Sequence, residues 1–135
     1  MEDKTNKRKQ TESIKESRIE FTEEISKEIL DDLKNLPEGE AGLVVIKGPG
    51  IGEKFFLTKS KFEIGRSPDS DILLDDITVS RKHAILEKVK DEYRILDLGS
   101  LNGSYINGVR VDSSKLSNGD RIQIGKYVFL FFSSR

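Results

Sequence analysis

The stretch "SYINGVRV" (104–111) carries the clearest folding signal in the sequence. Two short runs rich in β-branched and aromatic residues flank the dipeptide Asn107-Gly108. A two-residue type I′ turn needs positive φ at both central positions, and Asn followed by Gly meets that need best. The stretch therefore predicts a β-hairpin, and "SNGD" (117–120) predicts a second tight turn.

Runs of the same kind continue along the chain from Leu43 to Phe132. They are "LVVI", "KFFL", "FEIG", "DILL", "AILEKV", "YRILDL", "SYI", "VRV", "DRIQIG" and "YVFLFF". Gly, Pro, Asn, Asp or Ser lies between most of them, which is typical of strands joined by turns. The pattern predicts an all-β domain at 41–133, an antiparallel β-sandwich of about ten to eleven short strands.

The N-terminal part, residues 1–36, differs in composition. Residues 1–20 are polar and cannot bury enough surface to offset the entropy of ordering them, so we expect a flexible tail. An apolar stripe then recurs at helical spacing, and Thr22 can cap a helix at 22–35. The stripe comprises Phe21, Ile25, Ile29, Leu30, Leu33 and Leu36. Such a helix is marginal alone in water, so we expect it either to dock or to form part of the time.

Composition excludes several classes of function. The chain has 135 residues, a net charge of −1 and no cysteine. The charge argues against a broad nucleic-acid-binding surface, and the missing cysteines exclude disulfides and thiolate chemistry. The single histidine provides no metal cluster, and we expect no cofactor. The sequence has no membrane-spanning run and no signal peptide, so we expect a cytoplasmic protein.

Polar side chains gather in three of the expected loops. They lie in "GRSPDSD" (65–71), "TVSRKHAIL" (78–86) and "LGSLNGSYI" (98–106). Loops of a sandwich collect at its two ends, so these three can meet. They would join the guanidinium groups of Arg66 and Arg81 with the Ser80 hydroxyl and the Asn102 amide. Such donors suit a compact dianion such as a phosphate monoester.

Other interpretations of these polar stretches are weaker. His83 could act as a general base for Ser80 in a hydrolase, but a base needs its nucleophile within hydrogen-bond reach. The stretch "GPGIGEKF" (48–55) lacks the Gly-Lys-Ser/Thr ending of a phosphate loop, so we interpret it as a turn. The stretch "DSDILLDD" (69–76) lacks the glycine and ligand spacing of a calcium loop.

Taken together, the motifs Gly65-Arg66, Ser80-Arg81-Lys82-His83 and Asn102-Gly103 resemble those of the forkhead-associated (FHA) domain. The resemblance covers roughly residues 43–132. It implies a phosphothreonine-binding β-sandwich that is not an enzyme.

The resemblance also implies roles for individual residues. The phosphopeptide-binding set would be Arg66, Ser80, Arg81, Ser100, Leu101 and Asn102. Within it, Arg66 and Ser80 would bind the phosphate, Arg81 the phosphate or nearby peptide, and Asn102 the peptide backbone. Ser100 and Leu101 would help to shape the site. Structural support would come from Gly65, His83 and Gly103.

Longer stretches, such as "GRSPDSDILLDDITVSRKHAIL" (65–86), look like the small actinobacterial regulators GarA and OdhI within this family. That likeness implies an unphosphorylated domain that inhibits the 2-oxoglutarate dehydrogenase complex, with glutamate dehydrogenase as a further target in GarA. It also implies a Ser/Thr protein kinase that phosphorylates a tail threonine. The phosphorylated tail then occupies its own domain, an autoinhibited state that releases the target enzymes.

The tail departs from that group, because the motif Glu-Thr-Thr-Ser-Val-Phe is absent. The nearest stretch is "QTESI" (10–14), so Thr11 is our first phosphorylation candidate, followed by Thr22 and Thr5. A second alignment, "ESRIEF" (16–21), offers Ser17 and no threonine. The alternative function is a generic adaptor that recruits kinase substrates without inhibiting a metabolic enzyme.

Overall fold

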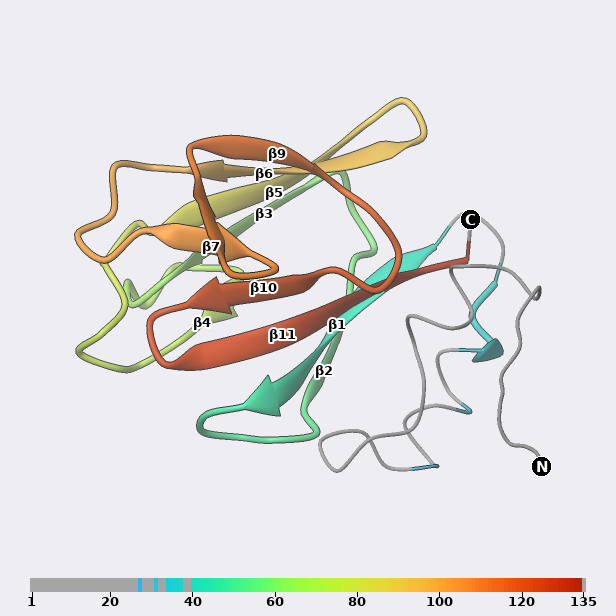
Figure 1. Ribbon diagram of the computed structural model, residues 1–135, viewed down its shortest axis with the longest axis horizontal. Helices are drawn as coiled ribbons and strands as arrows, with labels where there is room; N and C mark the ends of the chain where they lie inside the picture. The colour runs from blue at the N-terminus through green and yellow to red at the C-terminus, as the bar shows by residue number, and fades with distance from the viewer. Residues whose placement is uncertain (1–26, 28–30, 32–33, 38–39, 135) are drawn as a thin grey trace, which may run out of the picture.

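The computed structural model describes residues 27, 31, 34–37 and 40–134, and the strands between residues 41 and 133 form two packed β-sheets (Figure 1). The six-stranded sheet has the order β2-β1-β11-β10-β7-β8. Its strands are β1 (Ala41–Lys47), β2 (Lys54–Phe56), β7 (Ser104–Ile106), β8 (Val109–Val111), β10 (Arg121–Ile124) and β11 (Tyr127–Ser133). This architecture confirms the all-β sandwich predicted from the sequence.

The five-stranded sheet has the order β4-β3-β5-β6-β9. Its strands are β3 (Lys61–Gly65), β4 (Ile72–Leu73), β5 (Ala84–Val89), β6 (Glu92–Asp97) and β9 (Ser113–Leu116). The strand pairs of both sheets are antiparallel except β3–β4, which is parallel. The polar sequence of β9 does not predict a strand, so the observed count exceeds the list of apolar runs by this one strand.

The core lies between the sheets and follows from side-chain alternation along the strands. Leu43 and Val45 of β1 and Phe129 and Phe131 of β11 point into it and are at most 1% exposed. Side chains of the second sheet, Ile64, Leu86 and Ile95 among them, close it from the other side. The sheets are therefore held together by a single apolar layer.

The predicted turns adopt the expected backbone geometry. Asn107 and Gly108 have φ values of 51° and 86°, and they join β7 to β8 as a hairpin. The turn at 117–120 closes with a bond from Asp120 N–H to Ser117 O of 2.9 Å. The stretch 48–53 connects β1 to β2, so the segment that superficially resembles a phosphate loop is a turn between strands.

The loops that follow β3, β4 and β6 lie at one end of the sandwich, while the β5–β6 turn lies at the other (Figure 1). Most of the predicted helix at 22–35 falls outside the described residues, although Lys27, Asp31 and Lys34 have helical backbone. The described part of the chain holds no helix with the length and apolar character that a bilayer span requires.

Candidate functional site

The first of the three polar loops begins at Gly65, the last residue of β3. A Cβ atom at this position would lie 2.1 Å from the carbonyl oxygen of Arg81, so a larger residue cannot fit. The close approach lets Arg66 N–H donate to Ser80 O at 3.0 Å and Ser67 N–H donate to Arg81 O at 3.1 Å. Glycine thus allows the loop after β3 to pair with the loop before β5.

Arg66 is held by its side chain as well as by its backbone. Its Nε–H donates to the carbonyl oxygen of Val79 at 3.0 Å, which fixes the plane of the half-buried guanidinium group. A guanidinium has five N–H donors, and this bond uses one of them. Among the described residues, none bonds to the terminal nitrogens of Arg66. An anchored guanidinium of this kind can donate two parallel bonds to an anion.

The second and third loops meet through side-chain to backbone bonds. Leu101 N–H donates to Ser80 Oγ at 3.0 Å, and Asn102 Nδ2 donates to Thr78 O at 3.0 Å. The Ser80 oxygen is an acceptor in its bond, so its own O–H remains able to donate to an anion. Ser80, Asn102 and Arg66 therefore belong to one continuous surface.

His83 is completely buried behind this surface. Its Nδ1 accepts from Ser80 N–H at 3.0 Å, so the proton resides on Nε2, which donates to Gly103 O at 2.9 Å. Backbone bonds to Ile64 and Leu98 hold the residue itself. Both ring nitrogens are thus occupied by backbone groups, which leaves the imidazole unable to activate the Ser80 hydroxyl as a hydrolase would require.

The sequence and the fold match those of known proteins. The FHA domain model matches residues 62–125. The Oxoglutarate dehydrogenase inhibitor of Corynebacterium jeikeium is 52% identical over 101 residues, which make up 75% of this chain and 70% of that protein. This chain belongs to the FHA domain family. The family is a binding module rather than a class of enzymes.

Further relatives support the same assignment. The Glycogen accumulation regulator GarA of Mycobacterium tuberculosis is 48% identical over 101 residues, which cover 75% of this chain but only 62% of GarA. The solved FHA domain of the CT664 protein from Chlamydia trachomatis superposes with a TM-score of 0.64 at 33% identity, covering 70% of this chain and 97% of that one. A solved FHA domain from work on phosphothreonine-dependent FHA interactions gives 0.63 at 28% identity, with coverages of 69% and 95%.

Ser100 and Leu101 occupy different environments in this FHA domain. Ser100 is 7% exposed, and its Oγ donates to Asp97 at 2.6 Å while accepting from Gly103 N–H at 2.9 Å. Leu101 is 85% exposed and contributes its backbone N–H to Ser80. Ser100 therefore shapes the loop from within, whereas Leu101 presents an apolar side chain to solvent beside Ser80.

Asp97 organises the loop after β6, and sequence reasoning did not single it out. Its carboxylate accepts from Ser100 N–H at 2.9 Å, from Ser100 Oγ at 2.6 Å and from Ser104 Oγ at 2.6 Å. Burial opposes ionisation, yet these hydrogen bonds outweigh it and hold the pKa of Asp97 below its usual range. The pattern Asp-x-x-Ser in the sequence is the local signal that could have revealed it.

Thr78 also escaped the sequence analysis. Its hydroxyl donates to Asp76, and it accepts from Lys126 N–H at 3.0 Å, while Lys126 Nζ lies 3.1 Å from Asp76. Hydrogen bonds from Thr78, followed by the interaction with Lys126, lower the pKa of Asp76. These contacts tie the loop before β5 to the β10–β11 turn. No short-range pattern predicts them, because the partners lie 48 residues apart.

The remaining predicted residues lie at the same end of the domain. Arg81 and Lys82 are exposed beside Ser80 and add positive charge to this surface. Gly103 has a φ of 85°, a conformation that glycine adopts without strain, and its carbonyl accepts the His83 bond. Among the described residues, no group of three or more acidic, His or Cys side chains could hold a metal ion.

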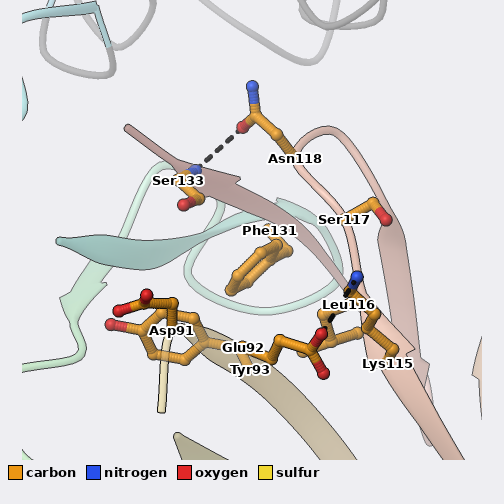
Figure 2. A pocket seen from close by; sticks show the side chains of 9 residues that line it. All are labelled: Asp91, Glu92, Tyr93, Lys115, Leu116, Ser117, Asn118, Phe131 and Ser133. Carbon is orange, nitrogen blue, oxygen red and sulfur yellow. Dashed lines mark hydrogen bonds and ion pairs between the residues drawn. The ribbon is translucent and has the colours of Figure 1, made fainter. Parts of the chain in front are cut away.

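A separate hollow of about 220 Å³ lies at the opposite end of the sandwich. It is bounded by the start of β6 and by the ends of β9 and β11. Figure 2 shows the Tyr93 and Phe131 rings within it, and their centroids are 5.6 Å apart. Lys115 pairs with Glu92 at 3.4 Å at its edge. The ring contact joins the two sheets, whereas the ion pair joins β9 to β6 within the five-stranded sheet. Because it lies at the other end of the sandwich, the hollow takes no part in the candidate site.

Proposed function

We propose that this FHA domain binds phosphothreonine peptides at the surface formed by its three polar loops. The observation that carries the proposal is the set of bonds that join these loops. The bonds from Leu101 N–H to Ser80 and from Asn102 to Thr78 join the third loop to the second. The bond from Arg66 N–H to Ser80 O joins the first loop to the second. In the proposal, Arg66 and Ser80 bind the phosphate. Arg81 contacts the phosphate or the adjoining peptide, and Asn102 bonds to the peptide backbone.

The supporting residues act through the positions of these donors. Gly65 allows Arg66 to approach the Ser80–Arg81 backbone, and His83 links the Ser80 loop to Gly103. Ser100 shapes the loop that presents Leu101 and Asn102. A charge-assisted hydrogen bond contributes about 1.5–3 kcal/mol, so two such donors account for strong selection of the phosphorylated peptide.

We further propose that the protein regulates 2-oxoglutarate dehydrogenase in the cytoplasm. This proposal is supported by the similarity of the chain to the Oxoglutarate dehydrogenase inhibitor of C. jeikeium and to the regulator GarA. A Ser/Thr protein kinase would phosphorylate Thr11, or else Thr22 or Thr5, and the modified tail would then fill its own binding surface. Glutamate dehydrogenase is the second enzyme that this switch would control.

Two measurements test the proposal. Calorimetric titration of the full chain should show binding of a peptide with phosphorylated Thr11 (residues 5–17) and none of the unmodified peptide. An assay of the 2-oxoglutarate dehydrogenase complex should show inhibition by the unmodified protein and relief when Thr11 is phosphorylated. Peptide binding without any inhibition would contradict the metabolic role and favour the adaptor.

A further inference from the structure

A second apolar cluster lies on the outer face of the six-stranded sheet. It is formed by Val44 and Ile46 of β1 with Leu130 and Phe132 of β11, and it is separate from the core between the sheets. Outward-facing side chains of a sandwich sheet ordinarily meet water. None of these four is more than 1% exposed. This outer cluster is therefore a covered surface.

One described residue shows where the cover comes from. Leu36, which precedes β1 in the sequence, packs against the outer cluster. Gly42 makes room for the Phe132 ring of the cluster, because a Cβ atom at Gly42 would lie 2.5 Å from Cζ of Phe132. The Phe132 ring meets Phe56 of β2 edge-on at 6.4 Å, which marks the edge of the cluster. The chain just before β1 thus runs onto this face.

The described residues farther upstream reveal which side of the segment faces water. Lys27, Asp31 and Lys34 have helical backbone and exposed side chains, and Asn35 N–H donates to Asp31 O at 3.2 Å. Their spacing of four and then three residues places them on one side of a helix. Two residues advance a helix by about 200°. On a helix that continues through this segment, Ile25, Ile29 and Leu33 would fall on the opposite side.

We propose that residues 22–34 form an amphipathic helix whose apolar stripe, Ile25, Ile29 and Leu33, covers the outer cluster together with Leu36 just beyond the end of the helix. Thirteen helical residues extend about 20 Å, and the seven residues of β1 extend about 23 Å, so the helix is close in length to the strand that it covers. Docking also explains how a helix that is marginal alone becomes stable.

The direction of the helix follows from its connection to β1. Ala41 pairs with Ser133 at the end of the sandwich away from the polar loops, whereas Lys47 pairs with Val128, close to the turn that bonds to Thr78. A short connection from Leu36 to Ala41 makes the helix run antiparallel to β1. Its N-terminal end then points toward the end that carries Arg66 and Ser80.

The docked helix shortens the tether of the tail, a consequence that rests on the proposed phosphothreonine function. Residues 12–21 alone would separate Thr11 from the helix, and ten residues reach at most about 33–36 Å. A short tether raises the effective concentration of phosphorylated Thr11 at the loops. Thr22 would lie at the start of the helix and would be the poorer ligand.

Paramagnetic broadening tests the docking directly in the full chain. The sequence has no cysteine, so Lys27→Cys provides a single thiol for a nitroxide label on the water-facing side of the helix. We expect broadened amide signals at Val44, Ile46, Leu130 and Phe132. A label at Lys61→Cys, exposed on the five-stranded sheet, is the control and should spare them. Equal broadening by both labels, or none from Lys27→Cys, overturns the proposal.

A mixed sample shows whether the helix that covers the face comes from the same chain or from a second copy. It combines nitroxide-labelled protein without isotope enrichment and isotope-enriched protein without a nitroxide. Docking within one chain gives no broadening in this mixture. Broadening there would mean that a second copy covers the face, which overturns the proposal. The docking should also persist in Arg66→Ala, so a failure of phosphopeptide binding remains distinguishable from a failure of docking.

A matched pair of substitutions provides a second measurement. Ile29→Gln places an amide in the apolar stripe, whereas Lys27→Gln makes the same side chain on the exposed side. We expect Ile29→Gln to lower the urea midpoint and to speed amide exchange in β1 and β11, with little change for Lys27→Gln. Identical behaviour of the two variants overturns the docking.

Discussion

The Nδ1 atom of His83 accepts a hydrogen bond from the backbone N–H of Ser80 at 3.0 Å. The other nitrogen of the same ring donates to Gly103 O at 2.9 Å. One buried imidazole therefore positions both the loop that carries Ser80 and the loop that carries Asn102. Direct binding and structural support fall to different side chains, and substitutions should separate them.

The first prediction concerns the two donors that we assign to the phosphate. Arg66→Ala or Ser80→Ala should weaken phosphothreonine-peptide binding by about 10- to 150-fold, the equivalent of one charge-assisted hydrogen bond. Both side chains are partly exposed, so the melting temperature should change little. Calorimetric titration and thermal unfolding of the same samples measure the two effects.

The second prediction concerns His83. Replacement by Ala leaves Ser80 N–H and Gly103 O without their partner in a buried place, so the free energy of unfolding should fall by about 2–4 kcal/mol. Urea unfolding followed by circular dichroism measures this loss. If His83→Ala, Arg66→Ala and Ser80→Ala lowered the melting temperature equally, the division between support and binding would be wrong.

Gly65 provides a steric test. Gly65→Ala would place a methyl group 2.1 Å from Arg81 O, so the loops must separate. We expect a loss of stability above about 3 kcal/mol and a loss of peptide binding. Gly99→Ala is the control, because it meets no atom within 4 Å and carries only the strain of its φ of 71°. Similar losses in urea unfolding for the two variants would contradict the steric account.

The lowered pKa of Asp97 predicts a pH dependence of stability. A carboxylate whose pKa is depressed by folding stabilises the native state above its unfolded pKa of about 3.9, and this contribution disappears as the pH falls through the folded pKa. Asp97→Asn should therefore cost most stability at pH 7 and progressively less below about pH 4. Urea midpoints of the unsubstituted protein and of Asp97→Asn, measured from pH 7 to pH 3, provide the comparison. A difference between their midpoints that grows toward low pH would contradict the prediction.

A positive charge at position 66 should not be sufficient for full phosphopeptide binding. Arg66→Lys keeps the positive charge but loses the Nε–H bond to Val79 O and the planar group that can bond twice to phosphate. We expect binding to fall about tenfold or more by titration. Arg81→Lys is the matched control, because Arg81 is exposed and should tolerate the change. Equal effects at both positions would contradict a special role for the anchored guanidinium.

The sequence predicts most of the sandwich, because strand propensity and turn chemistry agree along the chain. The Asn107-Gly108 hairpin is the clearest example, since both residues adopt the positive φ that the turn requires. The strand β9 was missed because "SSKL" (113–116) has no apolar pattern and is ordered by its pairing with β6. The parallel pairing of β3 with β4 likewise depends on the path of the loop between them.

The candidate site was only partly predictable. Motif residues such as Arg66, Ser80 and Asn102 lie in loops that the sequence marks as polar. The groups that bond to them are backbone carbonyls and amides, such as Val79 O and Leu101 N, and backbone groups leave no trace in residue type. The contact of Thr78 with Lys126 joins distant segments and emerges only from the fold.

The most direct test compares amide NMR spectra of the full-length protein with and without phosphate on Thr11. The account predicts shifts at Arg66, Ser80, Arg81 and Asn102 that do not depend on protein concentration, as an intramolecular switch requires. If phosphorylation at Thr11, Thr22 or Thr5 left these signals unchanged, the switch would be contradicted. The domain would then read phosphothreonines of other proteins only.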